Sequence, residues 1–395
     1  MKKWLSFLMV GALVAASLTG CAPKPAAPAA EAPAEAPAGE TVKVGWIGAL
    51  TGDMAVWGTC ELNTVKMMAE EANKNGGWLG KQIEVVGYDT KGDPTEAVNA
   101  TKRLVSQDKV VAIIGPNASG QAIAISQILE EGGVADIATV ATNPKVTVGD
   151  DGKVKPYNFR VCFIDPYQGA VGGGYAADVL KAKNAAILYD VSDEYSQGLT
   201  QFFEETFTAK GGTIVAKEAF KSGDLDFRAQ LSKIKESNPD VIFMPYFFKE
   251  VALTANQARE LGITAPMMGG DGWMSEQLLE MAGDSLEGCY LINHLDVDDP
   301  SVADFKKAYT DKYGTMVELN GYLAYDAFKL LEAAVLKADN LDSKAVAEAL
   351  TAVEVQGITG NIKIDPATHN PDGKEAAIVK IEGKTYKFQQ KYAPK

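Results

Sequence analysis

The chain of 395 residues has only two histidines, His294 and His369, and only four cysteines. It contains no CxxC pair and no GxSxG, HExxH or Walker motif. Metal and nucleophilic catalysis therefore lack their usual side chains. Acid–base chemistry would depend on carboxylates such as Asp53, Asp193 and Asp271. The composition favours binding over catalysis, and we expect neither enzyme activity nor a cofactor or metal.

Cysteine is also too scarce for a disulfide framework. Beyond Cys21 the sequence holds Cys60, Cys162 and Cys289, an odd number at wide spacing. A single bridge stays open as an alternative to three small, buried hydrophobic side chains.

The sequence has fewer basic residues than acidic ones, 38 against 52. The formal net charge is −14, and cleavage after a leader that contains Lys2 and Lys3 would make it more negative by two. Such a surface repels nucleic acid and anionic lipid, so we expect no nucleic-acid partner. The charge carries no information about the ligand.

The N-terminus has the features of a secretory signal. Lys2 and Lys3 precede an apolar run over residues 5–14, followed by the sequence Leu-Thr-Gly-Cys that ends at Cys21. The run is about half the length of a membrane-spanning helix. We therefore predict a cleaved signal over residues 1–20, lipidation of Cys21 and an Ala/Pro/Glu-rich linker to residue 40. An unmodified thiol after an ordinary signal is the alternative. The protein would be extracytoplasmic and lipid-anchored.

From residue 41 onward, apolar runs rich in β-formers alternate with segments of helical period. This alternation predicts an α/β fold with parallel sheets. The series runs twice, which predicts two Rossmann-like lobes joined by a hinge. The predicted strands are Val42–Leu50, Ile83–Tyr88, Val110–Gly115, Ala135–Val140, Ala185–Asp190, Thr213–Ala216 and Val241–Pro245, and the predicted helices include Glu61–Asn73, Glu96–Gln107, Gln121–Glu130 and Gln197–Thr208.

Polar residues follow several of the predicted strands, at the edge where parallel sheets bind ligands. Ser119 and Thr142, with small neighbours, would receive a carboxylate, although each could instead be a plain helix N-cap. Asp271 lies between glycines and would receive an ammonium group, with a turn aspartate as the alternative. An α-amino acid carries both groups. Trp57, Tyr195 and Phe247 would wall the cleft, unless each is simply a core residue of its lobe.

The residues then resemble a known family over essentially all of 41–395, the leucine/isoleucine/valine-binding proteins, which are type I substrate-binding proteins of ABC importers. No single fragment is specific, but their order and spacing are. The matching fragments are Val44-Gly45 through Leu50-Thr51-Gly52, Trp57-Gly58, Gly76-Gly77, Gly80-Lys81-Gln82-Ile83, Tyr88-Asp89, Asp93-Pro94, Ile114-Gly115 with Ser119, Ala141-Thr142-Asn143-Pro144, Tyr189-Asp190, Tyr195-Ser196-Gln197-Gly198, Gln257-Ala258-Arg259 with Gly262, and Gly270-Asp271-Gly272.

The resemblance implies a three-crossing hinge, with lobe 1 formed by 41–160 plus 290–356 and lobe 2 by 161–289 plus 357–395. It also implies the site. Ser119 and Thr142, with the backbone near Ala118, Val140 and Ala141, would hold the α-carboxylate. Asp271 and Tyr195 would hold the α-ammonium, under an aromatic side chain at Trp57 and another near Phe247.

Two departures from the family pattern concern the first lobe. The disulfide that some relatives carry there has no cysteines here. Asn117 and Asn320 fall where aliphatic-selective relatives carry apolar residues. A buried amide without a partner costs about 1–3 kcal/mol, which leads to the hypothesis that the ligand is a polar or small amino acid. A clear preference for leucine in competition binding would contradict it.

The expected partners are an amino acid, an ABC permease and the membrane through the lipid anchor, with the protein itself a monomer. Relatives that bind amides, urea or aromatic acids offer an alternative ligand class. Presentation of a ligand to a separate sensor is a further alternative, since the sequence shows neither a helix-turn-helix nor a second apolar run long enough for a receptor's membrane helix.

Overall fold

The computed structural model describes residues 41–394. The predicted signal, the lipidation site Cys21 and the linker lie outside the described residues. Between residues 41 and 394, no helix combines the length and apolar character that crossing a bilayer requires.

The first lobe is built on a five-stranded parallel sheet, in the order β2-β1-β3-β4-β5. Every residue of β3, β4 and β5 is buried, as expected when helices cover both faces. The strands are β1 Val42–Gly48, β2 Ile83–Asp89, β3 Ala112–Ile114, β4 Ala135–Ala138 and β5 Asn158–Arg160. The helices of this lobe are α1 Ala55–Lys74, α2 Pro94–Arg103 with a π-helical continuation at Leu104–Asp108, α3 Ser119–Gly132, α9 Ala303–Tyr313, α10 Leu319–Ala338 and α11 Ser343–Leu350.

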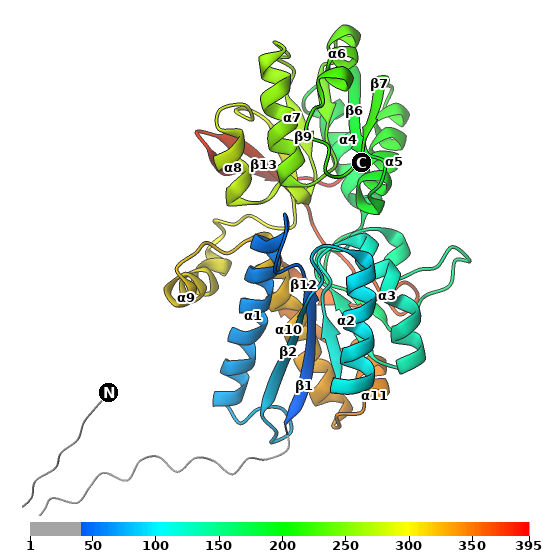
Figure 1. Cartoon of the computed structure of the whole chain (residues 1–395), viewed down its shortest axis with the longest axis vertical. Helices are drawn as coiled ribbons and strands as arrows, with labels where there is room; N and C mark the ends of the chain where they lie inside the picture. The colour runs from blue at the N-terminus through cyan, green and yellow to red at the C-terminus, as the bar shows by residue number, and fades with distance from the viewer. Residues whose placement is uncertain (1–40, 395) are drawn as a thin grey trace, which may run out of the picture. The chain divides into compact units, whose positions relative to one another are not determined.

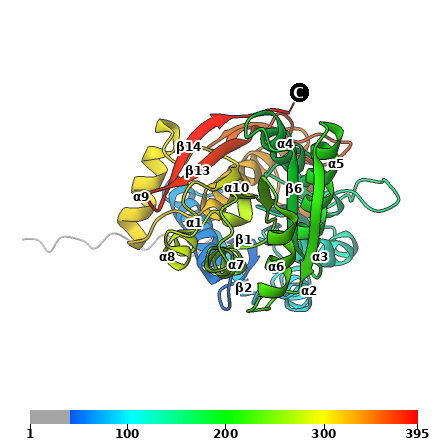
Figure 2. The same ribbon diagram turned by 90° about the horizontal axis from the view of Figure 1, so that it is seen from above.

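The second lobe contains a seven-stranded sheet in the order β14-β13-β10-β9-β8-β6-β7. Its parallel strands are β6 Asn184–Asp190, β7 Thr213–Phe220, β8 Val241–Phe243, β9 Met267–Gly269 and β10 Tyr290–Asn293. Antiparallel strands β13 Ala377–Glu382 and β14 Thr385–Lys391 extend one edge, visible as the paired red strands in Figure 2. The helices are α4 Asp165–Asp178, α5 Glu194–Ala209, α6 Arg228–Ser237, α7 Phe248–Glu260 and α8 Glu276–Ala282.

The two parallel sheets repeat one topology. In each, the first strand in the chain lies between the second and the third, and the fourth and fifth follow in order. This is a doubly wound arrangement with its switch point beside the first strand, where ligands bind outside the carboxyl ends of the strands. The predicted α/β fold with two parallel-sheet lobes is confirmed (Figure 1).

The chain passes between the two sheets three times, over residues 161–164, 294–302 and 364–376. Two predicted lobe boundaries are wrong. The boundary at 289/290 would assign β10 to lobe 1, yet β10 pairs with β9 and β13 of the second sheet. The boundary at 356/357 cuts strand β11 (Glu354–Gly357), which pairs with β12 (Gly360–Lys363) in a hairpin. Strand pairing keeps each of these elements within one lobe.

Helix α1 begins six residues before its predicted start, at Ala55 rather than Glu61. The first turn contains Gly58, which packs so closely against Ala49, the residue after β1, that a Cβ would lie 1.8 Å from the Ala49 carbonyl oxygen. Trp57 therefore lies on the first turn of a helix rather than in a loop.

Three cysteines lie among the described residues, and all three are free and buried. The single bridge left open by the sequence is therefore not formed between Cys60, Cys162 and Cys289. Burial raises the pKa of the Cys60 and Cys162 thiols to about 12, which makes both unreactive.

Candidate functional site

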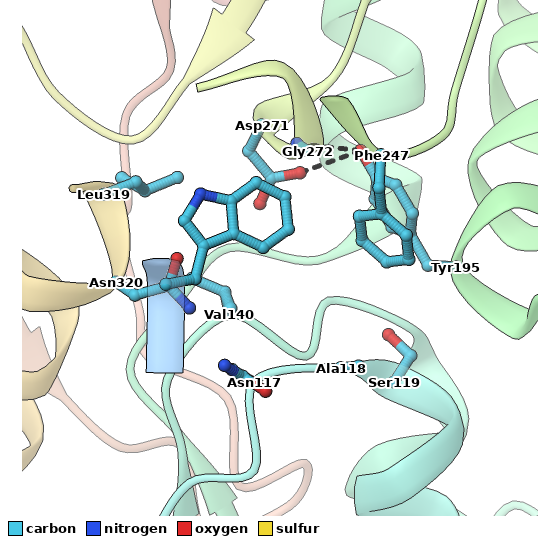
Figure 3. Close-up of a pocket in the computed structure, with 11 residues that line it drawn as sticks. Asn117, Ala118, Ser119, Val140, Tyr195, Phe247, Asp271, Gly272, Leu319 and Asn320 are labelled. Atoms are coloured by element: carbon cyan, nitrogen blue, oxygen red, sulfur yellow. Dashed lines mark hydrogen bonds between the residues drawn. The ribbon is translucent and has the colours of Figure 1, made fainter. Parts of the chain in front are cut away.

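A cavity lies where loops from the carboxyl ends of both parallel sheets meet (Figure 3). It contains about 330 Å³ of space that no protein atom occupies. All of its lining residues except Gly272 and Leu319 are among the predicted site residues. The lining is formed by Trp57, Asn117, Ala118, Ser119, Val140, Tyr195, Phe247, Asp271, Gly272, Leu319 and Asn320.

The N-terminus of α3 opens onto this cavity. Ala118 occupies the N-cap position and supplies no side-chain cap, so Ser119 is the first residue of the helix rather than its cap. Ser119 Oγ instead accepts a hydrogen bond from the backbone N–H of Asn143 at 3.2 Å. The first N–H groups of a helix have no intrahelical acceptor and carry a partial positive charge. Together with the Ser119 hydroxyl they form a site suited to an anion.

For two of the residues predicted to hold the carboxylate, this role stays a prediction. Neither Ala141 nor Thr142 lines the cavity, and both are fully buried. The carbonyl of Ala141 accepts a 2.6 Å hydrogen bond from Arg160 Nη1. Burial raises the pKa of Asp165 well above its usual range, and the Thr142 hydroxyl opposes this rise, but Thr142 Oγ1 makes no hydrogen bond of ordinary geometry among residues 41–394. Of the residues predicted to hold the carboxylate, Ala118, Ser119 and Val140 line the cavity.

Asp271 faces the cavity from the second lobe, immediately after β9. Its Oδ1 accepts hydrogen bonds from Tyr195 Oη at 2.9 Å and from Gln168 Nε2 at 3.0 Å, and its Oδ2 lies 3.0 Å from His294 Nε2. Gly270 makes this approach possible, because a Cβ there would lie 2.3 Å from the Tyr195 hydroxyl. The Asp271 carboxylate thus accepts from side chains of other segments, whereas a turn aspartate would accept from backbone N–H groups of its own turn.

The hydrogen-bond donors around Asp271 are neutral. Burial lowers the pKa of His294, and the neighbouring Asp271 only partly opposes this effect. His294 is also stacked on Phe163, with ring centroids 3.5 Å apart. Among residues 41–394, no lysine or arginine forms an ion pair with Asp271. A buried carboxylate without a cationic partner is costly, so this site is suited to a positively charged group.

Gln168 and His294 were not predicted as part of the site. Gln168 lies on α4, beyond the first crossing, and His294 directly follows β10. The position of His294 after a parallel strand was a usable signal, but nothing in the local sequence around Gln168 indicates its contact with Asp271.

Aromatic side chains from both lobes close over the cavity. Trp57 packs edge-on against Phe247 and Phe248, with centroids 5.7 and 4.9 Å away, and its Nε1 donates to the carbonyl of Met274 at 3.1 Å. Tyr195 stacks on Phe247 at 5.4 Å. Trp57 belongs to lobe 1 and its three partners to lobe 2, so these aromatics bridge the lobes rather than fill one core.

Further polar contacts join the lobes around the cavity. Lys249 Nζ pairs with Asp53 Oδ2 at 2.7 Å, and Asn143 Nδ2 donates to the carbonyl of Glu194 at 2.8 Å. Asp193 caps α5 by accepting from the N–H of Ser196. Of the three carboxylates that the sequence offered for acid–base chemistry, only Asp271 lines the cavity.

A second group of buried carboxyls lies in the first lobe. Glu61 on α1 is fully buried, and Thr139 Oγ1 donates to its Oε1. Burial raises the pKa of Glu61 from 4.5 to about 8, with hydrogen bonding by Thr139 and Asn320 opposing the rise. Burial and the nearby Glu61 raise the pKa of Asp136 well above its usual range. Glu61 is therefore largely protonated at neutral pH.

Two parallel-sheet lobes are joined by three connecting segments, and a cavity with polar and aromatic lining lies between the carboxyl edges of their sheets. This is the architecture of a two-lobed solute-binding protein.

Comparison with known proteins identifies the family. The family model described as periplasmic binding protein matches residues 41–385. A leucine-, isoleucine-, valine-, threonine- and alanine-binding protein of Pseudomonas aeruginosa is 30% identical over 333 residues, which cover 83% of this chain and 87% of the relative. The chain belongs to the periplasmic binding protein family, and its resemblance to the branched-chain amino acid-binding proteins of ABC importers is confirmed.

Two solved structures are similar over most of the chain. A leucine-binding protein from Thermotoga maritima has a TM-score of 0.83 at 34% identity, covering 90% of this chain and 99% of the other. The branched-chain amino acid transporter substrate-binding protein of Streptococcus pneumoniae, in complex with isoleucine, has a TM-score of 0.83 at 32% identity and coverages of 90% and 100%. The family is one of extracytoplasmic solute-binding proteins rather than enzymes.

Proposed function

We propose that this protein binds an α-amino acid in the cavity between its lobes and delivers it to the permease of an ABC importer. The observation that carries this proposal is the pairing of two opposite sites on one cavity. The open N-terminus of α3 with Ser119 suits a carboxylate, and Asp271, surrounded by neutral donors, suits an ammonium group. The two sites belong to different lobes.

Other ligand classes fit these two sites less well. An aromatic acid would satisfy the anion site but would leave Asp271 buried without a cation. An amide or urea carries no full charge and would satisfy neither end electrostatically. An α-amino acid neutralises both ends.

Because its two charged groups contact different lobes, such a ligand would stabilise the arrangement in which the lobes meet. The contacts of Trp57 with Met274 and of Lys249 with Asp53 support this mechanism, since both require the lobes to be close. A ligand bound to one lobe alone would not shift the equilibrium between open and closed forms. The permease would then distinguish the loaded, closed protein from the open one.

A thermal-shift screen of the refolded protein tests the ligand class. Unfolding and refolding first remove any carried ligand. The screen uses the twenty amino acids, simple amides and aromatic acids, together with amines and carboxylic acids that each lack one charged group of a responding amino acid. We expect stabilisation only by compounds with both groups, because each site needs its partner. Stabilisation by amides or aromatic acids alone would contradict the assignment of Asp271.

We further propose that the protein is a lipoprotein, anchored through Cys21 on the outer side of the cytoplasmic membrane or at the cell surface, and that it works as a monomer. The Leu-Thr-Gly-Cys sequence after a short apolar run supports this proposal. Cys21→Ser should abolish incorporation of a fatty-acid label and release the protein from the membrane fraction. A variant that stays labelled and membrane-bound would refute the anchor.

A further inference from the structure

Two carboxamide side chains lie together at one end of the cavity, on the side away from Tyr195 and Phe247 (Figure 3). Asn117 follows β3, and Asn320 lies in the first turn of α10, so both come from the first lobe. Only 1% of Asn117 and 2% of Asn320 is exposed. This end of the cavity is therefore polar but shielded from solvent.

The hydrogen-bonding capacity of these amides is not met by the described residues. Neither Nδ2 nor Oδ1 of Asn117 has a hydrogen-bond partner among residues 41–394. Asn320 interacts with the buried Glu61, but its Nδ2 makes no hydrogen bond of ordinary geometry among the same residues. Native interiors leave few buried polar groups unpaired, and those that remain require an explanation. Since both residues line the cavity, a ligand in it can supply the missing donors and acceptors.

The surroundings restrict the charge of such a ligand group. Asp271 is the only charged residue in the lining, at the opposite end from the amides, and the lining contains no lysine, arginine or histidine. Behind Asn320, the buried Glu61 is largely protonated at neutral pH and therefore offers no negative charge. Neither an acidic nor a basic side chain would find a counter-ion at this end.

We propose that the ligand's side chain is neutral and hydrogen-bonding, a hydroxyl or a carboxamide, and that Asn117 and Asn320 select it over an aliphatic side chain of the same shape. This inference rests on the proposed function, because the amino acid's charged groups must occupy Ser119 and Asp271 for its side chain to reach the amides. An aliphatic side chain would fill the same space but would leave Asn117 unpaired and offer Asn320 no hydrogen bond.

Matched amino-acid pairs test the proposal on the refolded full-length protein. Threonine and valine have nearly the same shape, as do asparagine and leucine, but only the first of each pair forms side-chain hydrogen bonds. By isothermal titration we expect at least one polar member to bind about tenfold or more tightly than its apolar counterpart. Tighter or equal binding of valine and leucine in both pairs would overturn the inference while leaving amino-acid binding intact. Binding of no amino acid would instead overturn the proposed function.

Substitution of the two amides provides a second test. Asn117→Leu and Asn320→Leu should each reduce or reverse the preference for the polar member of the pair, because the apolar side chain no longer leaves an amide unpaired. Asn361→Leu, at an exposed position on β12, is the matched control and should leave the preference unchanged. A folded Asn117→Leu or Asn320→Leu protein that keeps the full polar preference would also overturn the inference. If a variant does not fold, the wild-type comparison still decides.

Discussion

Asp271→Ala is expected to remove nearly all amino-acid binding while leaving the protein folded. The substitution takes away the only charged group in the cavity lining, and it leaves the ligand's ammonium buried without a counter-ion. Truncating one partner of a buried charge pair costs about 2–5 kcal/mol, so the dissociation constant should rise roughly 30-fold to several thousandfold. Isothermal titration of the refolded variant measures this change directly.

Two further variants separate charge from shape. Asp271→Asn keeps the size of the side chain but removes its charge, so it should lose most of the same affinity. Asp298→Asn removes an exposed carboxylate that pairs with Lys306 at the surface, and it should bind normally. Unchanged affinity in Asp271→Asn would show that no cationic group lies against this residue.

The second large effect concerns the pH dependence of stability. Glu61 has a pKa of about 8 in the folded protein and 4.5 ordinarily, so the folded state binds more protons between these values. The contribution of protonated Glu61 to the free energy of unfolding is therefore fully present below pH 4.5. This contribution is lost as the pH rises through 8. Glu61→Gln, which stays neutral, should be more stable than wild type at pH 8, by on the order of a few kcal/mol.

Denaturant unfolding at several pH values between 5 and 8 measures this difference. The two proteins should have similar stability near pH 5 and diverge progressively above it. Glu84→Gln, at an exposed position on β2, serves as the control and should show a nearly constant difference. A Glu61→Gln protein that follows the wild-type pH profile would mean that Glu61 is not held protonated by burial.

Much of the fold followed from the sequence because parallel strands buried on both faces leave continuous apolar runs. The same physics placed the site, since the loops after β3, β4, β8 and β9 must meet at the carboxyl edges of the sheets. Asn117, Val140, Phe247 and Asp271 all follow such strands. The predicted start of α1 is six residues too late. The close contact of Gly58 with Ala49 in the first turn leaves no signal in the hydrophobic periodicity of the sequence.

Other parts of the site depend on how the lobes are assembled. Gln168 and His294 reach Asp271 only because the chain crosses between the lobes just before one and just after the other. Thr142 is itself predicted to hold the carboxylate, but the turn after β4 leaves it fully buried and outside the cavity lining. The misplaced boundary before β10 has the same origin, because pairing with β13 involves strands far apart in the sequence.

The central claim is that one ligand joins an anion site in the first lobe to a cation site in the second. The most direct test is a crystal structure of the refolded protein with an amino acid that stabilises it. We predict the ammonium nitrogen within about 3 Å of Asp271 and the carboxylate oxygens at the same distance from Ser119 Oγ and the first N–H groups of α3. A reversed ligand, or one that contacts only one lobe, would contradict the account.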